Sequence, residues 1–130
     1  MAKSGKASKP RFERKGIKSY SLEKNKGILL STIAKNENLY IREFVEYYRK
    51  LNFTKIIIFD NNDINGETFD YIINDYIKSS YVDIIDIRGL SSIQIAVINY
   101  SYKKYKYLYD WIAFFDIDEF LYIKKTRKLM

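Results

Sequence analysis

Apolar and polar residues follow two different rhythms along the chain. Solid apolar runs or two-residue alternation predict buried strands at residues 28–33, 55–60, 81–87 and 111–115. Between these runs, apolar side chains recur every three or four residues, which predicts amphipathic helices at residues 40–51, 69–77 and 93–107. Apolar strands separated by amphipathic helices are typical of a parallel sheet with helices on both faces. The pattern therefore predicts an α/β domain over residues 28–130.

Basic charge is concentrated before the first predicted strand. The chain has 23 Lys and Arg against 16 Asp and Glu, a formal net charge of +7. Residues 1–27 carry the whole excess and contain no apolar run, so we expect a disordered basic tail there, with an anionic surface or RNA as its alternative role. The remaining residues are neutral overall, which argues against nucleic-acid binding by the folded part. No signal peptide and no membrane span is evident, and we expect a cytoplasmic protein.

The absence of two residue types limits the chemistry. The chain contains no cysteine and no histidine. Disulfide scaffolds, thiol nucleophiles, imidazole acid–base catalysis and histidine-ligated metals are therefore excluded. A metal in this protein would be held by oxygen atoms, which favours Mg²⁺, Mn²⁺ or Ca²⁺.

Each predicted strand is followed by a carboxylate. The strand ends read Lys35-Asn36-Glu37, Asp60-Asn61-Asn62, Asp86-Ile87-Arg88 and Asp116-Ile117-Asp118-Glu119. In a parallel sheet these ends gather at one edge, where ligands bind. Asp116 and Asp118 point the same way in extended backbone and repel each other unless a cation intervenes. A divalent ion whose coordination is completed by phosphate oxygens would neutralise this repulsion. From the spacing alone, it is an equal alternative that these residues are ordinary strand-end or helix-capping acids.

Three blocks of sequence carry a family resemblance. The motifs are K-N-E after the first strand, D-N-N after the second and W-x-x-F-x-D-x-D-E-F-L at the fourth. On these motifs, residues 28–123 resemble glycosyltransferases of the family 92 and family 2 types. The resemblance implies a GT-A fold, a Rossmann-like sheet that binds a UDP- or GDP-linked sugar with Mn²⁺ or Mg²⁺ as cofactor. It implies transfer of the sugar to a hydroxyl of an acceptor whose nature (glycan, lipid or protein) stays open.

The resemblance also implies roles for individual residues. Asp116 and Asp118 would form the metal-binding DxD pair, with Asp118 the direct ligand and Asp116 nearer the ribose or donor sugar. The other residues implied at the nucleotide-sugar site are Asn36, Glu37, Asp60, Asn61 and Gln94.

Further residues receive supporting roles by the same resemblance or from the strand pattern. We expect Trp111 to pack in a buried strand, Glu119 and Phe120 to shape the loop, and Tyr48 to serve packing. Arg88 is a weaker candidate for assisting the diphosphate.

The chain stops soon after the DxD block. Family members of this fold use a following segment for the acceptor, and residues 123–130 offer no carboxylate as catalytic base. We therefore expect an N-terminal, nucleotide-sugar-binding half whose base lies beyond Met130. Two alternatives stay open, a non-catalytic nucleotide-binding fragment and, less favoured, a haloacid-dehalogenase-type phosphatase with its D-x-D loop at DIDEF.

Overall fold

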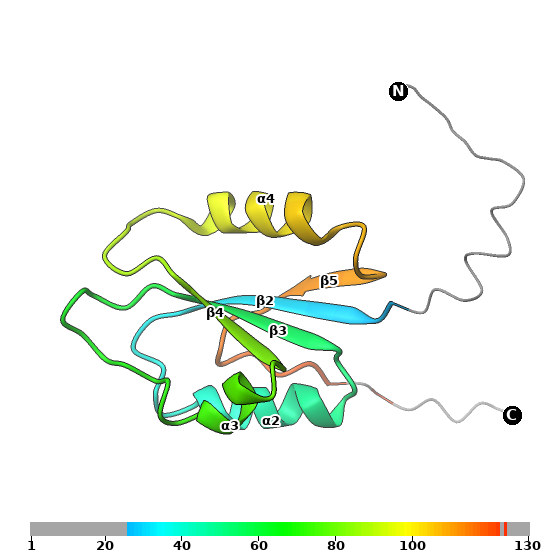
Figure 1. The fold of residues 1–130 in the computed structure, drawn as a ribbon, viewed down its shortest axis with the longest axis horizontal. Coiled ribbons are helices and arrows are strands. Elements are labelled where there is room, and N and C mark those ends of the chain that lie inside the picture. The colour runs from blue at the N-terminus through cyan, green and yellow to red at the C-terminus, as the bar shows by residue number, and fades with distance from the viewer. Residues whose placement is uncertain (1–25, 123, 125–130) are drawn as a thin grey trace, which may run out of the picture.

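A computed structural model describes residues 26–122 and 124, and strands alternate with helices throughout this part (Figure 1). The expected basic tail lies outside the described residues except for Lys26 and Gly27, as do residues 123 and 125–130. No helix of the described part is long and apolar enough to cross a membrane. In chain order the elements are β2 (Ile28–Ala34), α2 (Ile41–Lys50), β3 (Lys55–Asp60), α3 (Asn74–Lys78), β4 (Val82–Asp86), α4 (Gln94–Tyr105) and β5 (Trp111–Phe114).

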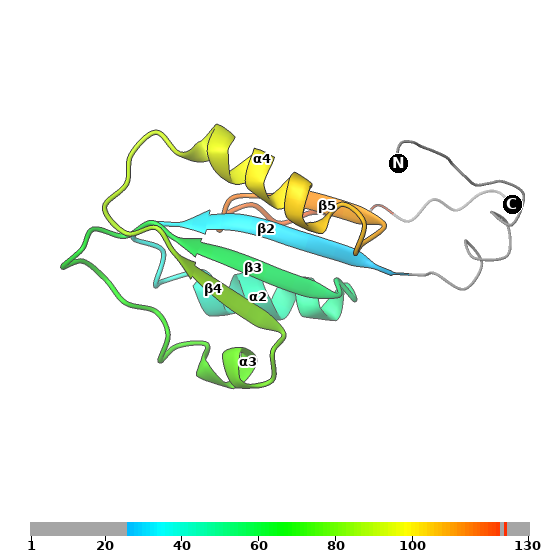
Figure 2. The same cartoon turned by 45° about the horizontal axis from the view of Figure 1, so that its top comes forward.

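The strands form one parallel sheet in the order β4-β3-β2-β5. Helix α4 covers one face, and α2 and α3 lie against the other (Figures 1 and 2). The predicted parallel α/β architecture with helices on both faces is therefore confirmed. Since every strand runs in the same direction, all the strand ends that carry polar motifs meet at one edge.

The two faces of the sheet bury separate apolar clusters. In β2, Leu30 points to the α2 side and Leu29 to the α4 side, as the alternation of a strand requires. The central strands β2 and β3 are buried along most of their length, whereas β4 and β5 at the edges are only partly covered. The side covered by α2 holds the larger cluster, which includes Phe44, Tyr48 and Ile117.

The helix predicted at residues 69–77 is much shorter than expected. Only α3 is helical, although Phe69 and Ile73 are buried as the apolar spacing requires. Two carbonyl groups, one within this stretch and one just before it, accept from side chains of other segments instead of from helical amides. The Thr68 carbonyl accepts from Asn38 Nδ2 at 2.9 Å, and the Ile72 carbonyl accepts from Arg42 at 2.8 Å. Turns therefore replace the first part of the predicted helix.

The expectation that Trp111 packs in a buried strand is wrong, since its side chain is 72% exposed. Trp111 begins β5, which lies at the edge of the described sheet and pairs there with β2 on one side. The apolar run of the sequence marks a strand correctly, but the burial of each residue depends on strand order, which the run does not specify.

Candidate functional site

A hollow of about 680 Å³ opens at the edge where the strands end. Its walls come from the ends of β2, β3 and β5 and from the first turn of α4. A smaller apolar hollow between α4 and β5 adjoins it and shares Ile33, Gln94 and Asp116 with it. The lining residues of the large hollow are Ile33, Lys35, Glu37, Asn61, Ser92, Ile93, Gln94, Ile95, Asp116 and Asp118.

The turn after β5 presents two carboxylates to this hollow. Ile117 is fully buried in the core cluster, so Asp116 and Asp118 on either side of it remain exposed. Glu119 closes the turn, because its Oε1 accepts from the Asp116 amide at 2.8 Å and its own amide donates to the Asp116 carbonyl at 2.9 Å. The buried isoleucine therefore fixes which way both aspartates face.

Helix α2 holds the continuation of this turn in place. The buried Tyr48 hydroxyl donates to the Glu119 carbonyl and accepts from the Leu121 amide, each at 2.8 Å. Tyr47 donates to the Leu121 carbonyl, and the Phe120 ring packs edge-on against Tyr47 with centroids 5.1 Å apart. Tyr48 thus packs in the core as expected, and Glu119 and Phe120 shape the loop as expected.

Two carboxyl groups of the hollow, those of Glu37 and Asp116, have a raised pKa. Burial raises the pKa of Glu37, and the nearby charges of Asp118 and Asp116 raise it further. Burial also raises the pKa of Asp116, with additional contributions from Glu119 and Asp118. Among the described residues, neither Asp116 nor Asp118 has a basic side chain within ion-pair distance. The charges of the two aspartates therefore have no compensating ion-pair partner in the described part of the chain.

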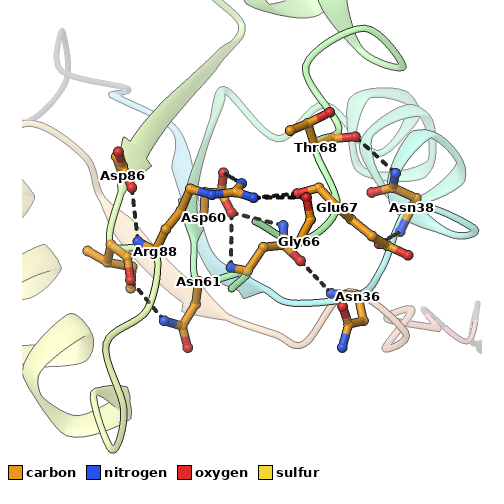
Figure 3. Close-up of polar contacts among 11 residues, drawn as sticks. Asn36, Asn38, Asp60, Asn61, Gly66, Glu67, Thr68, Asp86 and Arg88 are labelled. Carbon is orange, nitrogen blue, oxygen red and sulfur yellow. Dashed lines mark hydrogen bonds and ion pairs between the residues drawn. The ribbon is translucent and has the colours of Figure 1, made fainter. Parts of the chain in front are cut away.

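Asp60, at the end of β3, is in a different environment. The residue is 6% exposed, and its carboxylate pairs with Arg88 at 2.7 Å (Figure 3). Arg88 also donates to the carbonyls of Gly66 and Glu67, at 3.2 and 2.8 Å, and so ties the loop after β3 to the loop after β4. Both charged groups are engaged with each other, and they line a separate hollow on the β4 side.

Asn62 connects this ion pair to the end of β2. Its side chain is fully buried; the amide Nδ2 donates to Asp60 Oδ1 at 2.9 Å and Oδ1 accepts from the Asn36 backbone amide at 2.7 Å. Asn36 adopts a left-handed conformation with φ of 58°, which asparagine tolerates better than most residues. This link fixes the turn that leads into Glu37.

The structure brings five of the seven predicted site residues to the large hollow: Glu37, Asn61, Gln94, Asp116 and Asp118. Asn36 and Asp60 do not line it. Gln94 arrives as the first residue of α4, and the Asn61 Nδ2 donates to the carbonyls of Ile87 and Leu90, at 2.9 and 2.8 Å. Arg88, considered for the diphosphate, is held by Asp60 instead.

Sequence reasoning missed several residues of this edge. Lys35 lines the hollow with its Nζ 3.6 Å from Asp63 Oδ1, and its place as the first residue of the K-N-E motif was the available signal. Asn62, which is buried, is the second asparagine of the D-N-N motif, and that motif was the available signal for it. Ser92, with φ of 55°, and Ile95 had no signal in the strand-end pattern.

Comparison with known proteins gives a family and one relative. The model of glycosyltransferase family 92 matches residues 30–130. A galactan beta-1,4-galactosyltransferase of Arabidopsis thaliana is 29% identical over 91 residues, which cover 64% of this chain and 17% of the relative. The chain thus spans about 17% of that relative's length. No solved structure matches. With most of its length matched by the family model, the chain belongs to glycosyltransferase family 92.

Proposed function

We propose that this chain binds the nucleotide-sugar donor of a metal-dependent glycosyltransferase with a GT-A fold. The observation that supports this proposal most strongly is the convergence of Glu37, Asp116 and Asp118 on one hollow at the carboxyl edge of a parallel sheet. Ligands of open α/β sheets bind at this edge. The family match favours this proposal over the phosphatase hypothesis.

The side chains of the hollow divide into two groups by chemistry. Asn61 and Gln94 offer amide groups that suit the hydroxyl and carbonyl groups of a ribose, base or sugar. Lys35 supplies the positive charge that a diphosphate requires. Asp116 and Asp118 form the DxD pair of the proposal and face the diphosphate end of the donor.

The pair fits a divalent cation that is shared with the ligand. The described residues contain no group of three or more acidic side chains close enough to enclose a metal by themselves. Two carboxylates leave most positions of a Mg²⁺ or Mn²⁺ ion for phosphate oxygens and water, as is usual for these ions at nucleotide sites. When bound, the ion would neutralise the charge that develops on the departing diphosphate.

The name of the relative gives only a starting point for identifying the donor sugar and the acceptor. That relative is named as a galactosyltransferase, so UDP-galactose is the first donor to test on this chain. The proposal concerns donor binding, and it assigns no catalytic base among the described residues.

Isothermal titration calorimetry tests the proposal. UDP and GDP are titrated into the full chain with Mn²⁺ and, separately, with EDTA. We expect at least one nucleoside diphosphate to bind with Mn²⁺ and to bind at least about tenfold more weakly in EDTA, because phosphate oxygens complete the ion's coordination. Equal affinity in both conditions would contradict the metal bridge. No binding in either condition would contradict the donor site as a whole.

A further inference from the structure

The two ends of the sheet carry opposite charge. The end opposite the hollow, where the strands begin and the helices finish, is called here the amino pole. Helices α2, α3 and α4 each end in basic residues at this pole, and Lys26, Lys55 and Lys106 add charge beyond those helix ends. The basic residues gathered here are Lys26, Arg49, Lys50, Lys55, Lys78, Lys103, Lys104 and Lys106.

The described carboxylates at the starts of the strands are already engaged. Asp83, at the start of β4, pairs with Lys55 at 3.0 Å. Asp110 accepts from the backbone amides of Lys26 and Gly27, at 2.9 and 3.2 Å. Basic residues in the last turn of a helix interact favourably with the helix dipole. This interaction does not account for Lys26 and Lys106, which lie outside the helices. The described residues of the amino pole therefore carry a net positive charge.

Exposed aromatic and aliphatic side chains accompany this charge. Tyr107 is 76% exposed, and Leu108 beside it is 58% exposed, at the turn that follows α4. The Lys106 ammonium lies 5.1 Å from the centre of the Tyr102 ring and 5.0 Å from that of Tyr107. Lys26 Nζ donates to the Tyr107 carbonyl at 3.0 Å, so the patch is continuous with the start of β2.

We propose that the amino pole docks on the surface of an anionic lipid bilayer. Lysines attract the headgroups of acidic lipids, and tyrosine and leucine enter the boundary between headgroups and acyl chains. The exposed Trp111 at the start of β5 belongs to the same end, and tryptophan is enriched at such interfaces. The sequence before Lys26 is rich in lysine and arginine and joins the fold at this pole.

This docking orients the protein. The strands end at the side of the sheet opposite the amino pole (Figure 1). The acidic hollow lies at those strand ends, so it is repelled by the same surface that attracts the amino pole. The hollow then stays open to solvent while the protein is bound. The inference does not depend on what the hollow binds.

Vesicle co-sedimentation of the full chain tests the inference. Vesicles of phosphatidylcholine alone are compared with vesicles that also contain phosphatidylserine, at low and high salt. We expect binding to the phosphatidylserine vesicles that weakens as salt rises. The double variant Lys103→Gln/Lys106→Gln should bind about tenfold more weakly, because each lysine near an anionic surface contributes appreciably.

The matched control lowers the net charge by the same amount, but at the end of the sheet where the strands end. Asn65→Asp/Ser91→Asp places two new charges on exposed positions of the loops that follow β3 and β4, at the end of the sheet opposite the amino pole, and it should bind these vesicles as wild type does. Leu108→Ser changes no charge and should weaken binding several-fold with an unchanged thermal midpoint, since the side chain is exposed.

Four results would overturn the inference. Equal binding of wild type to the two kinds of vesicle would contradict the docking surface. A lysine double variant that binds as tightly as wild type, or a control that loses as much, would assign binding to the preceding segment or to net charge. Binding to a single-stranded RNA oligonucleotide without binding to vesicles would identify a nucleic-acid surface instead.

Discussion

Two acidic groups at the same edge of the sheet have opposite surroundings. Asp60 is buried, and its charge is compensated by Arg88 at 2.7 Å and by two hydrogen bonds from Asn62. Asp116 and Asp118 are exposed to a hollow and have no basic partner among the described residues. The same sequence signal, an acid at a strand end, thus produces a structural ion pair in one place and uncompensated charge in the other.

The buried ion pair stabilises the fold, whereas the two exposed aspartates are free to bind a ligand. A buried ion pair is costly to break, because the remaining partner keeps its desolvation penalty. Exposed like charges stabilise nothing by themselves and gain a favourable partner only from a ligand. We therefore expect substitutions at the Asp60 pair to act on stability and substitutions at the hollow to act on binding.

Breaking the buried pair should have the largest effect on stability. Arg88→Met leaves Asp60 charged and buried, and we expect the free energy of unfolding to fall by about 3–5 kcal/mol. Urea denaturation measures this change. The double variant Arg88→Met/Asp60→Asn should recover part of the loss, because it removes the unpaired charge. A loss below about 1 kcal/mol in Arg88→Met would show that the pair behaves as a surface ion pair.

Loosening the support of the Asp116 turn should have an intermediate effect. Tyr48→Phe removes the buried hydroxyl that links Glu119 to Leu121, and we expect a loss of about 1–3 kcal/mol because two backbone groups lose their partner. Tyr71→Phe is the matched control, since Tyr71 is 74% exposed and should change stability little. Equal unfolding midpoints of the two variants would mean that the hydroxyl of Tyr48 is not part of the support.

An exposed ion pair between α2 and α3 should have the smallest effect. Hydrogen bonding to Arg42 lowers the pKa of Asp75 to about 2 from its ordinary value of 3.8. A carboxylate with a lowered pKa in the folded state stabilises the fold above its ordinary pKa, and this contribution is lost as the pH falls from about 4 to 2.

The pH dependence of thermal unfolding in Asp75→Asn checks this expectation. In this pH range the variant should lose less stability than wild type on acidification, and the difference should be small because both side chains are largely exposed. Identical slopes for the two proteins would contradict a lowered pKa of Asp75.

Much of the fold and part of the site follow from sequence for physical reasons. A continuous apolar run predicts strands such as β3, because a strand buried on both faces needs apolar side chains on both. The parallel arrangement then brings Glu37, Asp116 and Asp118 to one edge without further information. These predictions depend on local pattern and on a general rule of topology.

The remainder depends on pairs of residues that are distant in the sequence. The pairing of Asp60 with Arg88, 28 positions away, is set by the path of two loops, and no local pattern indicates it. The turns before α3 arise because Asn38 and Arg42 take carbonyls that a helix would need. The exposure of Trp111 depends on strand order. Each error therefore comes from tertiary context that overrides a local preference.

We propose that the acids of the hollow are reserved for a metal-bound ligand, and thermal unfolding of Asp118→Asn with and without Mn²⁺ and UDP tests this claim. We expect the metal-free variant to be at least as stable as wild type, because one of two repelling charges is removed at nearly constant shape. We also expect Mn²⁺ with UDP to raise the midpoint of wild type but not that of the variant. A variant that is less stable than wild type yet retains the full shift with Mn²⁺ and UDP would contradict the claim.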